Sequence, residues 1–353
     1  MEPDPGNAGE RNMKKKLIIG AAILIFVLGV VFYPKNSPTT SAPKQLQEVT
    51  LALDWTPNTN HTGIYVAQEK GWYKDAGIRV TILPYSQAVS SDVLVATKKA
   101  DVGISSTEGV VSDASLGSPV VSIASIIQHN TSSLVVKEDS GITRPSDLDG
   151  KIYGGFGAPF EEAVVRKIIQ SDGGRGEFEN VTLTVSAMQA LETGQVDFVW
   201  IFDGWDGVAA KMQGLSLISF PITAFGIPDY ATPNIITHPD LVNTKSDRIK
   251  RFMKATVKGY EYAREYPIES ANLLLNAVPK GTFADVDLVR QSQLYLSRRY
   301  GDTGGTWGVQ KKSTWTKYPA FMLKEKLLTD AKGTEITSLD YASLYSNVFF
   351  FEQ

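Results

Sequence analysis

Residues Glu48–Ile82 read EVTLALDWTPNTNHTGIYVAQEKGWYKDAGIRVTI, and this stretch indicates the fold class. Glu48–Leu53 alternates like a half-buried strand, Ile64–Lys70 reads as a helix, and Arg79–Tyr85 reads as the next strand. Strands that alternate with helices predict α/β layers with largely parallel sheets. Between the first strand and the helix lies the polar segment Asp54–His61, which contains a tryptophan and a histidine where a solvated turn would be ordinary.

The same alternation continues along the chain. Further strands are expected at Ala100–Ser106, Pro119–Ile127, Leu134–Ile142, Lys151–Gly157 and Asn234–Val242, and helices at Ser90–Ala100 and Glu161–Gly173. Beyond Asn234–Val242 the pattern is mostly helical.

Two segments share one pattern, an apolar strand that runs into a charged turn. They are Leu134–Ile142 and Asn234–Val242, and they bracket a central α/β unit. This arrangement predicts two crossings between two lobes: a discontinuous lobe 1 of residues 47–130 and 237–353, and a lobe 2 of residues 131–236. One large doubly wound sheet is the alternative.

Composition excludes several classes of function. The chain has 353 residues, 42% of them hydrophobic, and a net charge of −3, so it is long enough for two cores and is not a basic nucleic-acid binder. It has no cysteine and three histidines, which excludes thiolate chemistry and disfavours a metal site. Dinucleotide, P-loop, nucleophile-elbow and zinc-protease motifs do not occur. We therefore expect no catalytic residue, metal or cofactor.

The N-terminal segment predicts export. Residues 1–16 end in three lysines, residues 17–33 form an uncharged apolar run, and residues 34–46 form a Pro/Ser/Thr linker. We interpret these as a cytoplasmic segment, a signal-anchor and a tether that holds the protein at the outer face of the membrane. A cleaved signal peptide is the alternative, and both place the protein outside the cytoplasm. Translation could start at Met1 or at Met13.

Aromatic and neutral polar residues gather where the predicted strands end, which is where open α/β sheets bind ligands. The candidate ligand-binding residues are Trp55, Asn58, Asn60, His61, Tyr65, Ser106, Thr107, Glu108, Phe156, Gly157, Pro159, Glu161, Phe202, Asp203, Trp205 and Tyr230. Their rings could stack on a flat ligand, and a carboxylate such as Glu108, Glu161 or Asp203 could accept hydrogen bonds from an aminopyrimidine.

Several of these residues have a structural alternative. Trp200 is expected in the core, and Glu161 with Glu162 could simply favour a helix N-terminus. His129 could be a structural hydrogen-bonder near the first crossing, and His238 is expected at the surface.

The sequence resembles a known family through LDWTPNTNHTGIYVAQEKGWYKDAGIRVTI, KKADVGISS, GSPVVSIASII and LDGKIYGGFGAP. These segments are similar to the solute-binding proteins of ABC importers, and among them to the thiamine-pyrimidine-precursor-binding group. The resemblance implies a type II periplasmic-binding-protein fold, in which two lobes close over a small molecule. It makes the Asp54–His61 segment one wall of the ligand cleft, with Asp203 or Trp205 in the opposing wall.

One enzyme branch of this superfamily, the fungal pyrimidine-precursor synthases, is disfavoured. These enzymes bind pyridoxal phosphate on a lysine and consume their own histidine. Alignment of DVGISSTEGVVSDA with their segment puts Ser105 at the lysine position and Gly109 at the histidine position. Their cysteine-rich motif is absent.

The resemblance and the candidate residues together predict a monomeric, membrane-tethered solute-binding protein that is not an enzyme. Its partners would be a small aromatic ligand and the permease and ATPase of an ABC transporter. The expected ligand is a thiamine pyrimidine, a hydroxymethyl- or formamidomethyl-aminopyrimidine, with riboflavin as the alternative. Alkanesulfonate and nitrate are disfavoured because no arginine lies near the candidate strand ends up to Gly207.

Overall fold

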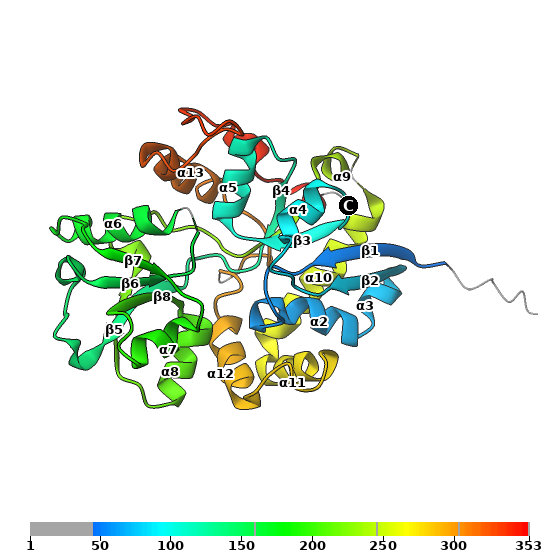
Figure 1. Ribbon diagram of the computed structural model, residues 1–353. Helices are drawn as coiled ribbons and strands as arrows, with labels where there is room; N and C mark the ends of the chain where they lie inside the picture. Colours follow the sequence, from blue (N-terminus) through cyan, green and yellow to red (C-terminus); the bar gives the residue numbers. More distant parts are fainter. Residues whose placement is uncertain (1–44, 159, 245, 303, 352–353) are drawn as a thin grey trace, which may run out of the picture. The chain divides into compact units, whose positions relative to one another are not determined.

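The computed structural model describes residues 45–158, 160–244, 246–302 and 304–351 (Figure 1). Within them the named strands form two five-stranded sheets, each with helices against it. The predicted cytoplasmic segment 1–16, the signal-anchor 17–33 and most of the linker 34–46 lie outside the described residues. In the part of the chain that is described, no helix is long and apolar enough to cross a membrane.

The first sheet has the strand order β2-β1-β3-β10-β4. Its strands are β1 Gln47–Ala52, β2 Ile78–Leu83, β3 Val102–Ser105, β4 Val121–Ser125 and β10 Asn234–Thr237. Strand β1 pairs in parallel with β2 and β3, whereas β10 runs antiparallel to both β3 and β4.

The second sheet has the order β7-β6-β8-β5-β9. Its strands are β5 Ser132–Lys137, β6 Ile152–Gly155, β7 Glu179–Thr182, β8 Phe198–Phe202 and β9 Leu217–Pro221. Strand β6 pairs in parallel with β7 and β8, and β5 runs antiparallel to β8 and β9.

The predicted two-lobed α/β fold with two crossings is confirmed, and the alternative of one large sheet is wrong. The chain passes from the first sheet to the second between β4 and β5, and returns between β9 and β10. The sheets are mixed rather than largely parallel, because β5 and β10, the first strand after each crossing, run antiparallel to their neighbours. The exact lobe bounds of 47–130 with 237–353 and of 131–236 stay a prediction.

Helices connect and cover the strands. In the first lobe they include α2 Thr62–Glu69, α3 Trp72–Asp75, α4 Ser91–Ala96 and α5 Thr107–Leu116, with the 3-10 turn η2 Thr59–His61 before α2. Between β5 and β10 lie the turns η3 Glu138–Ser140, η4 Pro145–Leu148 and η6 Ile222–Ala224, the helices α6 Glu161–Ser171, α7 Ala187–Glu192 and α8 Val208–Met212, and the π-helical turn η5 Asp203–Gly207. After β10 come α9 Pro239–Asn243, α10 Asp247–Glu265, α11 Pro267–Ala277, α12 Val286–Ser297, α13 Thr314–Lys324, the turn η7 Tyr341–Ser343 and α14 Val348–Phe351.

Helices α2 and α10 cross at two glycines, and this crossing supports the segment that precedes α2. A Cβ atom on Gly259 would lie 1.9 Å from the Gly63 carbonyl oxygen, and one on Gly63 would lie 2.2 Å from the Tyr260 ring. Only glycine permits so close an approach of the two backbones. The Tyr260 hydroxyl then donates a 2.6 Å hydrogen bond to the Asn60 carbonyl, which ties η2 to α10.

Helix α12 packs against α11 and also contacts α8 and η5 of the lobe built on the second sheet. Figure 1 shows α12 between α11 and α8. The Ser292 hydroxyl donates to the Gly204 carbonyl in η5 and lies 2.6 Å from the Thr59 hydroxyl in η2. Elsewhere Lys167 of α6 lies 3.7 Å from Glu325, which follows α13. The two lobes therefore touch where α12 meets η5 and again where Lys167 meets Glu325.

Candidate ligand-binding site

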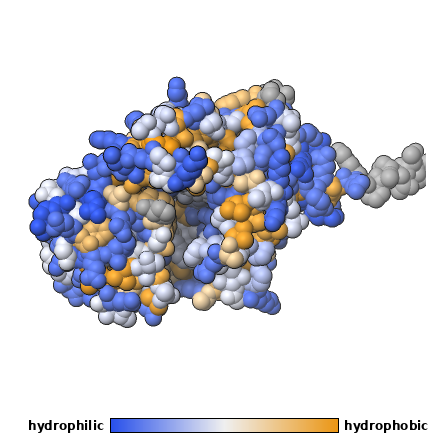
Figure 2. Space-filling view, turned by 45° about the horizontal axis from the view of Figure 1, so that its top comes forward, coloured by the Kyte–Doolittle hydropathy of each residue, from blue (hydrophilic) through white to orange (hydrophobic). Residues whose placement is uncertain are grey.

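Three large aromatic side chains are left half-exposed at the carboxyl ends of strands in both lobes. Trp55 after β1 is 54% exposed, Phe156 after β6 is 54% exposed, and Phe202 at the end of β8 is 50% exposed. Figure 2 shows the surface hollowed between the two lobes. Open α/β sheets bind ligands at the carboxyl ends of their strands, so these three exposed rings are candidates for ligand contact.

The segment Asp54–His61 is held by hydrogen bonds inside itself. The backbone N–H of Asn58 donates to Nδ1 of the fully buried His61 at 3.3 Å, so Nε2 carries the proton and donates to Asp54 Oδ1 at 2.8 Å. Asn58 in turn accepts from the N–H of Asn60 at 2.9 Å. His61 and Asn58 thus shape the turn, and the Asp54 carboxylate, 31% exposed, is the group they present.

Trp55 lies beside Tyr85, which follows β2. Their ring centroids are 4.8 Å apart at an interplanar angle of 42°. This contact leaves part of the Trp55 ring open to solvent. Tyr65, by contrast, is buried against α11 and α12, and burial raises its pKa to about 12.

At the start of α5, two predicted site residues have structural partners. The Ser106 hydroxyl caps the helix and accepts from the Gly109 N–H at 2.9 Å. The buried Thr107 hydroxyl donates to the Ala231 carbonyl and accepts from the Asn234 amide at 2.8 Å. The bond to Ala231 attaches the N-terminus of α5 to the second crossing, and the bond from Asn234 attaches it to β10.

Glu108, in the first turn of α5, is only 4% exposed. Its Oε1 accepts from the hydroxyl of Tyr230, whereas its Oε2 has no partner among the described residues. Tyr230 stacks on Tyr318 with ring centroids 3.9 Å apart, and the buried Tyr318 hydroxyl also lacks a partner there. Burial raises the pKa of Glu108, an effect that the hydrogen bond from Tyr230 opposes. A buried polar atom without a partner is costly, so a bound ligand that donates to Oε2 would be stabilised.

In the second lobe, Glu161 organises the loop after β6. Its carboxylate accepts from the Tyr153 hydroxyl at 2.8 Å and from the N–H groups of Phe156 and Ala158 at 2.9 and 2.7 Å. Gly157 has a φ of 86°, which favours glycine there. Glu161 is therefore bonded within the protein and positions Phe156. Pro159 lies outside the described residues.

Phe156 packs edge-on against Phe160 and Trp200, with centroid distances of 6.3 and 6.1 Å. Trp200 is buried, as expected of a core residue, but its Nε1–H has no hydrogen-bond partner among the described residues.

The turn η5 places two predicted residues near α12. Asp203 accepts from the Ser133 hydroxyl at 3.2 Å, and burial raises its pKa to about 6, against the opposing charge of Arg299. Trp205 packs against Phe283 at 6.0 Å and shares a hydrophobic cluster with Tyr65.

Sequence reasoning missed two residues that the structure brings to this region, Tyr295 and Arg299, and named Asp54 only as the start of the predicted cleft wall. The Arg299 guanidinium lies 3.6 Å above the Tyr295 ring and donates to the Tyr295 carbonyl at 2.9 Å. An arginine therefore does lie near Asp203, although none was expected from the chain up to Gly207. The only sequence signal was a tyrosine and paired arginines at the end of a predicted helix, far from any strand end.

The site has hydrogen-bonding groups and aromatic faces, and its chemistry suits binding. Within the residues described, no group of three or more histidine, aspartate or glutamate side chains could hold a metal ion.

The chain has two α/β lobes, two crossings between them and aromatic residues at the strand ends. This is the two-lobed fold of periplasmic solute-binding proteins. The periplasmic aliphatic sulphonate binding protein SsuA of Escherichia coli has this fold, with a TM-score of 0.62 at 12% identity over 83% of this chain and 93% of that one. The model of the family described as NMT1/THI5 like matches residues 58–270, and the chain belongs to this family. The resemblance seen in the sequence is thereby confirmed.

Relatives in this family include binding proteins and enzymes. The formylaminopyrimidine-binding protein of Halalkalibacterium halodurans is 26% identical over 299 residues, 83% of this chain and 90% of that protein. The riboflavin-binding protein RibY of Chloroflexus aurantiacus is 26% identical over 317 residues, 84% of this chain and 86% of that protein. A 4-amino-5-hydroxymethyl-2-methylpyrimidine phosphate synthase of Legionella pneumophila is 25% identical over 236 residues, 66% of this chain and 74% of the enzyme.

Proposed function

We propose that this protein is the extracytoplasmic solute-binding component of an ABC importer and that it binds a thiamine-type aminopyrimidine between its lobes. One observation carries the proposal: Trp55, Phe156 and Phe202 are half-exposed at strand ends of both lobes. An aromatic ligand placed among them would cover these rings, and each stacked pair would contribute about 0.5–1.5 kcal/mol beyond burial.

Glu108 and Asp54 support an aminopyrimidine in particular. Oε2 of Glu108 is buried without a partner, and Asp54 is held by His61 with one carboxylate oxygen bonded. An exocyclic amine beside a protonated ring nitrogen presents two donors, which a carboxylate accepts together. In this proposal His61, Asn58 and Glu161 are positioning residues, and Trp55, Asp54, Glu108 and Phe156 contact the ligand.

Riboflavin is the second candidate ligand. The three exposed aromatic residues offer room for a larger ring system, and a relative of similar coverage is a riboflavin-binding protein. Both ligands would use the same fold and the same closure of the lobes.

An enzyme of the synthase type is disfavoured by the end of β3 and the first turn of α5. Ser105, which aligns with the cofactor-binding lysine of the fungal enzymes, has a buried hydroxyl that donates to Asp92. A hydroxyl cannot form the imine that a lysine forms with pyridoxal phosphate. Gly109 aligns with the consumed histidine, and a Cβ there would lie 2.7 Å from the Ser105 hydroxyl.

Export and tethering through residues 17–33 remain part of the proposal, as do the permease and ATPase as partners and the monomeric state. Support comes from the apolar run and linker in the sequence and from relatives that are binding proteins.

The ligand is tested by thermal unfolding of the full chain with formylaminopyrimidine, hydroxymethylpyrimidine, thiamine, riboflavin, taurine and nitrate. A true ligand at about 100 times its dissociation constant adds roughly 2.7 kcal/mol, which raises the midpoint by about 2–4 °C per kcal/mol. We expect a shift with the pyrimidines. If only riboflavin raises the midpoint, riboflavin is the ligand in place of the pyrimidine. If only taurine or nitrate raises it, the aromatic site is contradicted.

A further inference from the structure

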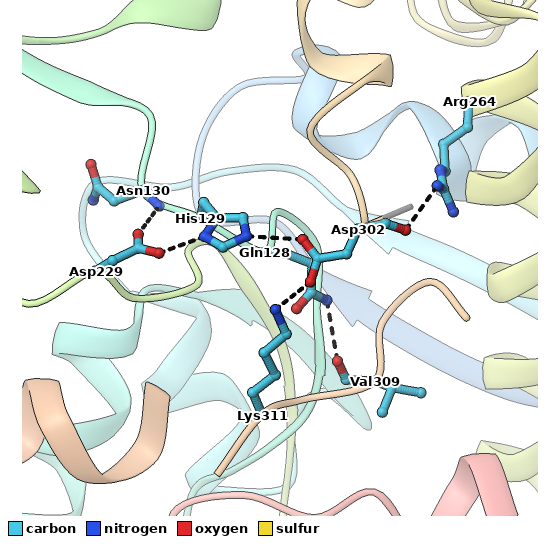
Figure 3. Close-up of polar contacts among 8 residues, drawn as sticks. All are labelled: Gln128, His129, Asn130, Asp229, Arg264, Asp302, Val309 and Lys311. Carbon is cyan, nitrogen blue, oxygen red and sulfur yellow. Dashed lines mark hydrogen bonds and ion pairs between the residues drawn. The ribbon is translucent and has the colours of Figure 1, made fainter. Parts of the chain in front are cut away.

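His129 lies in the first crossing, between β4 and β5, and bonds to two aspartates (Figure 3). Its Nδ1 lies 2.5 Å from Asp229 Oδ2, and its Nε2 lies 2.9 Å from Asp302 Oδ1. A carboxylate only accepts hydrogen bonds, and a neutral imidazole has one N–H. Both contacts are hydrogen bonds at once only when both ring nitrogens are protonated, so this geometry is that of an imidazolium.

The other charged groups around His129 also favour its doubly protonated form. The Lys311 ammonium is paired with the second oxygen of Asp302, and the Arg264 guanidinium donates to the Asp302 carbonyl at 3.3 Å. The N–H of Asn130 donates to the second oxygen of Asp229 at 3.0 Å. Both aspartates are therefore held in place as acceptors. The hydrogen bond to Asp229, and then that to Asp302, raises the pKa of His129, while partial burial opposes the rise.

The three bonded residues come from the segments that govern lobe movement. His129 belongs to the first crossing, Asp229 to the second, and Asp302 to the loop after α12. In the described chain the two sheets are joined covalently only through these two crossings. A bond between the crossings, with a third point on the first lobe, restricts the backbone rotations by which such lobes open.

We propose that doubly protonated His129 is a pH-sensitive clamp on the hinge, which holds the two crossings and the loop at Asp302 in the arrangement seen here. Loss of a proton to solvent leaves a nitrogen lone pair facing a carboxylate oxygen, so one of the two bonds is lost and the contact becomes repulsive. Since the pKa of clamped His129 is raised, the clamp is complete below the ordinary histidine value of 6.5 and is lost as pH rises through the raised value.

The clamp is tested by measuring the distance between the lobes in the full chain. The chain has no cysteine, so Lys74→Cys on α3 and Glu192→Cys on α7 would be its only spin-labelling sites; both positions are exposed. Pulsed electron paramagnetic resonance then gives the distance distribution between about pH 5.5 and pH 9, a range that spans the ordinary histidine pKa. We expect one narrow population at low pH and a second, displaced population that grows as pH rises above 6.5.

The substitution His129→Gln should remove this pH dependence, because a glutamine amide does not titrate. The matched control is His238→Gln: His238 also lies beside an aspartate, 3.5 Å from Asp240, but it caps α9 after β10 and is not part of either crossing. The His238→Gln variant should keep the pH dependence of the distance between the lobes. If His129→Gln does not fold, Asp302→Asn removes one carboxylate and should move the transition to lower pH. A distance that is constant with pH in the wild type, or a transition that survives in His129→Gln, would overturn the clamp.

Discussion

At the scale of single residues, Glu108 is a buried carboxylate whose surroundings leave one oxygen available to a ligand. The first turn of α5 places its carboxylate against the Tyr230 hydroxyl, and the Tyr230 ring stacks on Tyr318. One carboxylate oxygen is therefore bonded, and the other has no partner among the described residues. A charged group kept in such surroundings lowers stability unless something else pairs with it. We infer that the missing partner is the ligand.

The substitution Glu108→Gln keeps the side-chain volume and an acceptor for Tyr230 but removes the negative charge. Hydrogen bonds to charged groups contribute about 1.5–3 kcal/mol, so affinity for an aminopyrimidine should fall about tenfold or more. Glu162→Gln is the matched control, because Glu162 is exposed and, among the described residues, its side chain bonds to Asn180 at 2.7 Å. Calorimetric titration measures both, and equal affinities for the two variants would rule out contact between Glu108 and the ligand.

The raised pKa of Glu108 predicts how the free energy of unfolding depends on pH. Because burial raises the pKa of Glu108 above its ordinary 4.5, the folded protein keeps this proton to a higher pH than the unfolded chain. Its contribution to the free energy of unfolding therefore falls as pH rises from 4.5 to the raised pKa, and stays low above it. Denaturant titrations across this range should show the wild type losing stability relative to Glu108→Gln as pH rises. Parallel curves would mean that the carboxylate is solvated.

At the scale of elements, the crossing of α2 and α10 fixes the first wall of the site. The two glycines at the contact bring the helix backbones together, and the Tyr260 hydroxyl then reaches η2. Tyr260 also stacks on Trp307 with ring centroids 3.9 Å apart, which anchors α10 in the core.

Gly259→Ala should destabilise the protein, because its Cβ would overlap the Gly63 carbonyl, a backbone atom that cannot rotate away. Overpacking of this kind costs about 1–3 kcal/mol or more. The control is Gly305→Ala, whose Cβ would come no nearer than 3.7 Å to another atom. The free energy of unfolding from denaturant titration should fall only for Gly259→Ala. An unchanged value there would show that the helices can separate without cost.

The elements were largely predictable from the sequence, because strand alternation and turn residues are local signals. Strand β1 and helix α6 lie close to where the pattern put them. The pattern could not give strand direction, which depends on how β5 and β10 enter their sheets. Nor could it show that His61 turns inward to hold Asp54, that His238 is buried rather than at the surface, or that α12 brings Arg299 to Asp203. These are contacts between residues distant in the chain or choices of side-chain direction.

At the scale of the whole molecule, each of the two lobes contributes an aromatic face to the proposed site. Trp55 belongs to the first lobe and Phe156 to the second. In the proposed function, a ligand between them would favour the arrangement in which both rings contact it, and the permease would recognise that arrangement. The hinge, with His129 bonded to both of its partners, would then set how readily the lobes part.

Binding of the ligand between the lobes is tested by calorimetric titration of formylaminopyrimidine into the full chain and into Trp55→Ala, Phe156→Ala and Trp72→Ala. Trp72 is the control, because it lies on α3 beside Tyr262 and Lys258, away from the strand ends. We predict one saturable site in the wild type, weakened roughly 2- to 10-fold by Trp55→Ala and by Phe156→Ala, and unchanged by Trp72→Ala. Binding that survives intact in both cleft variants would contradict a ligand held between the lobes.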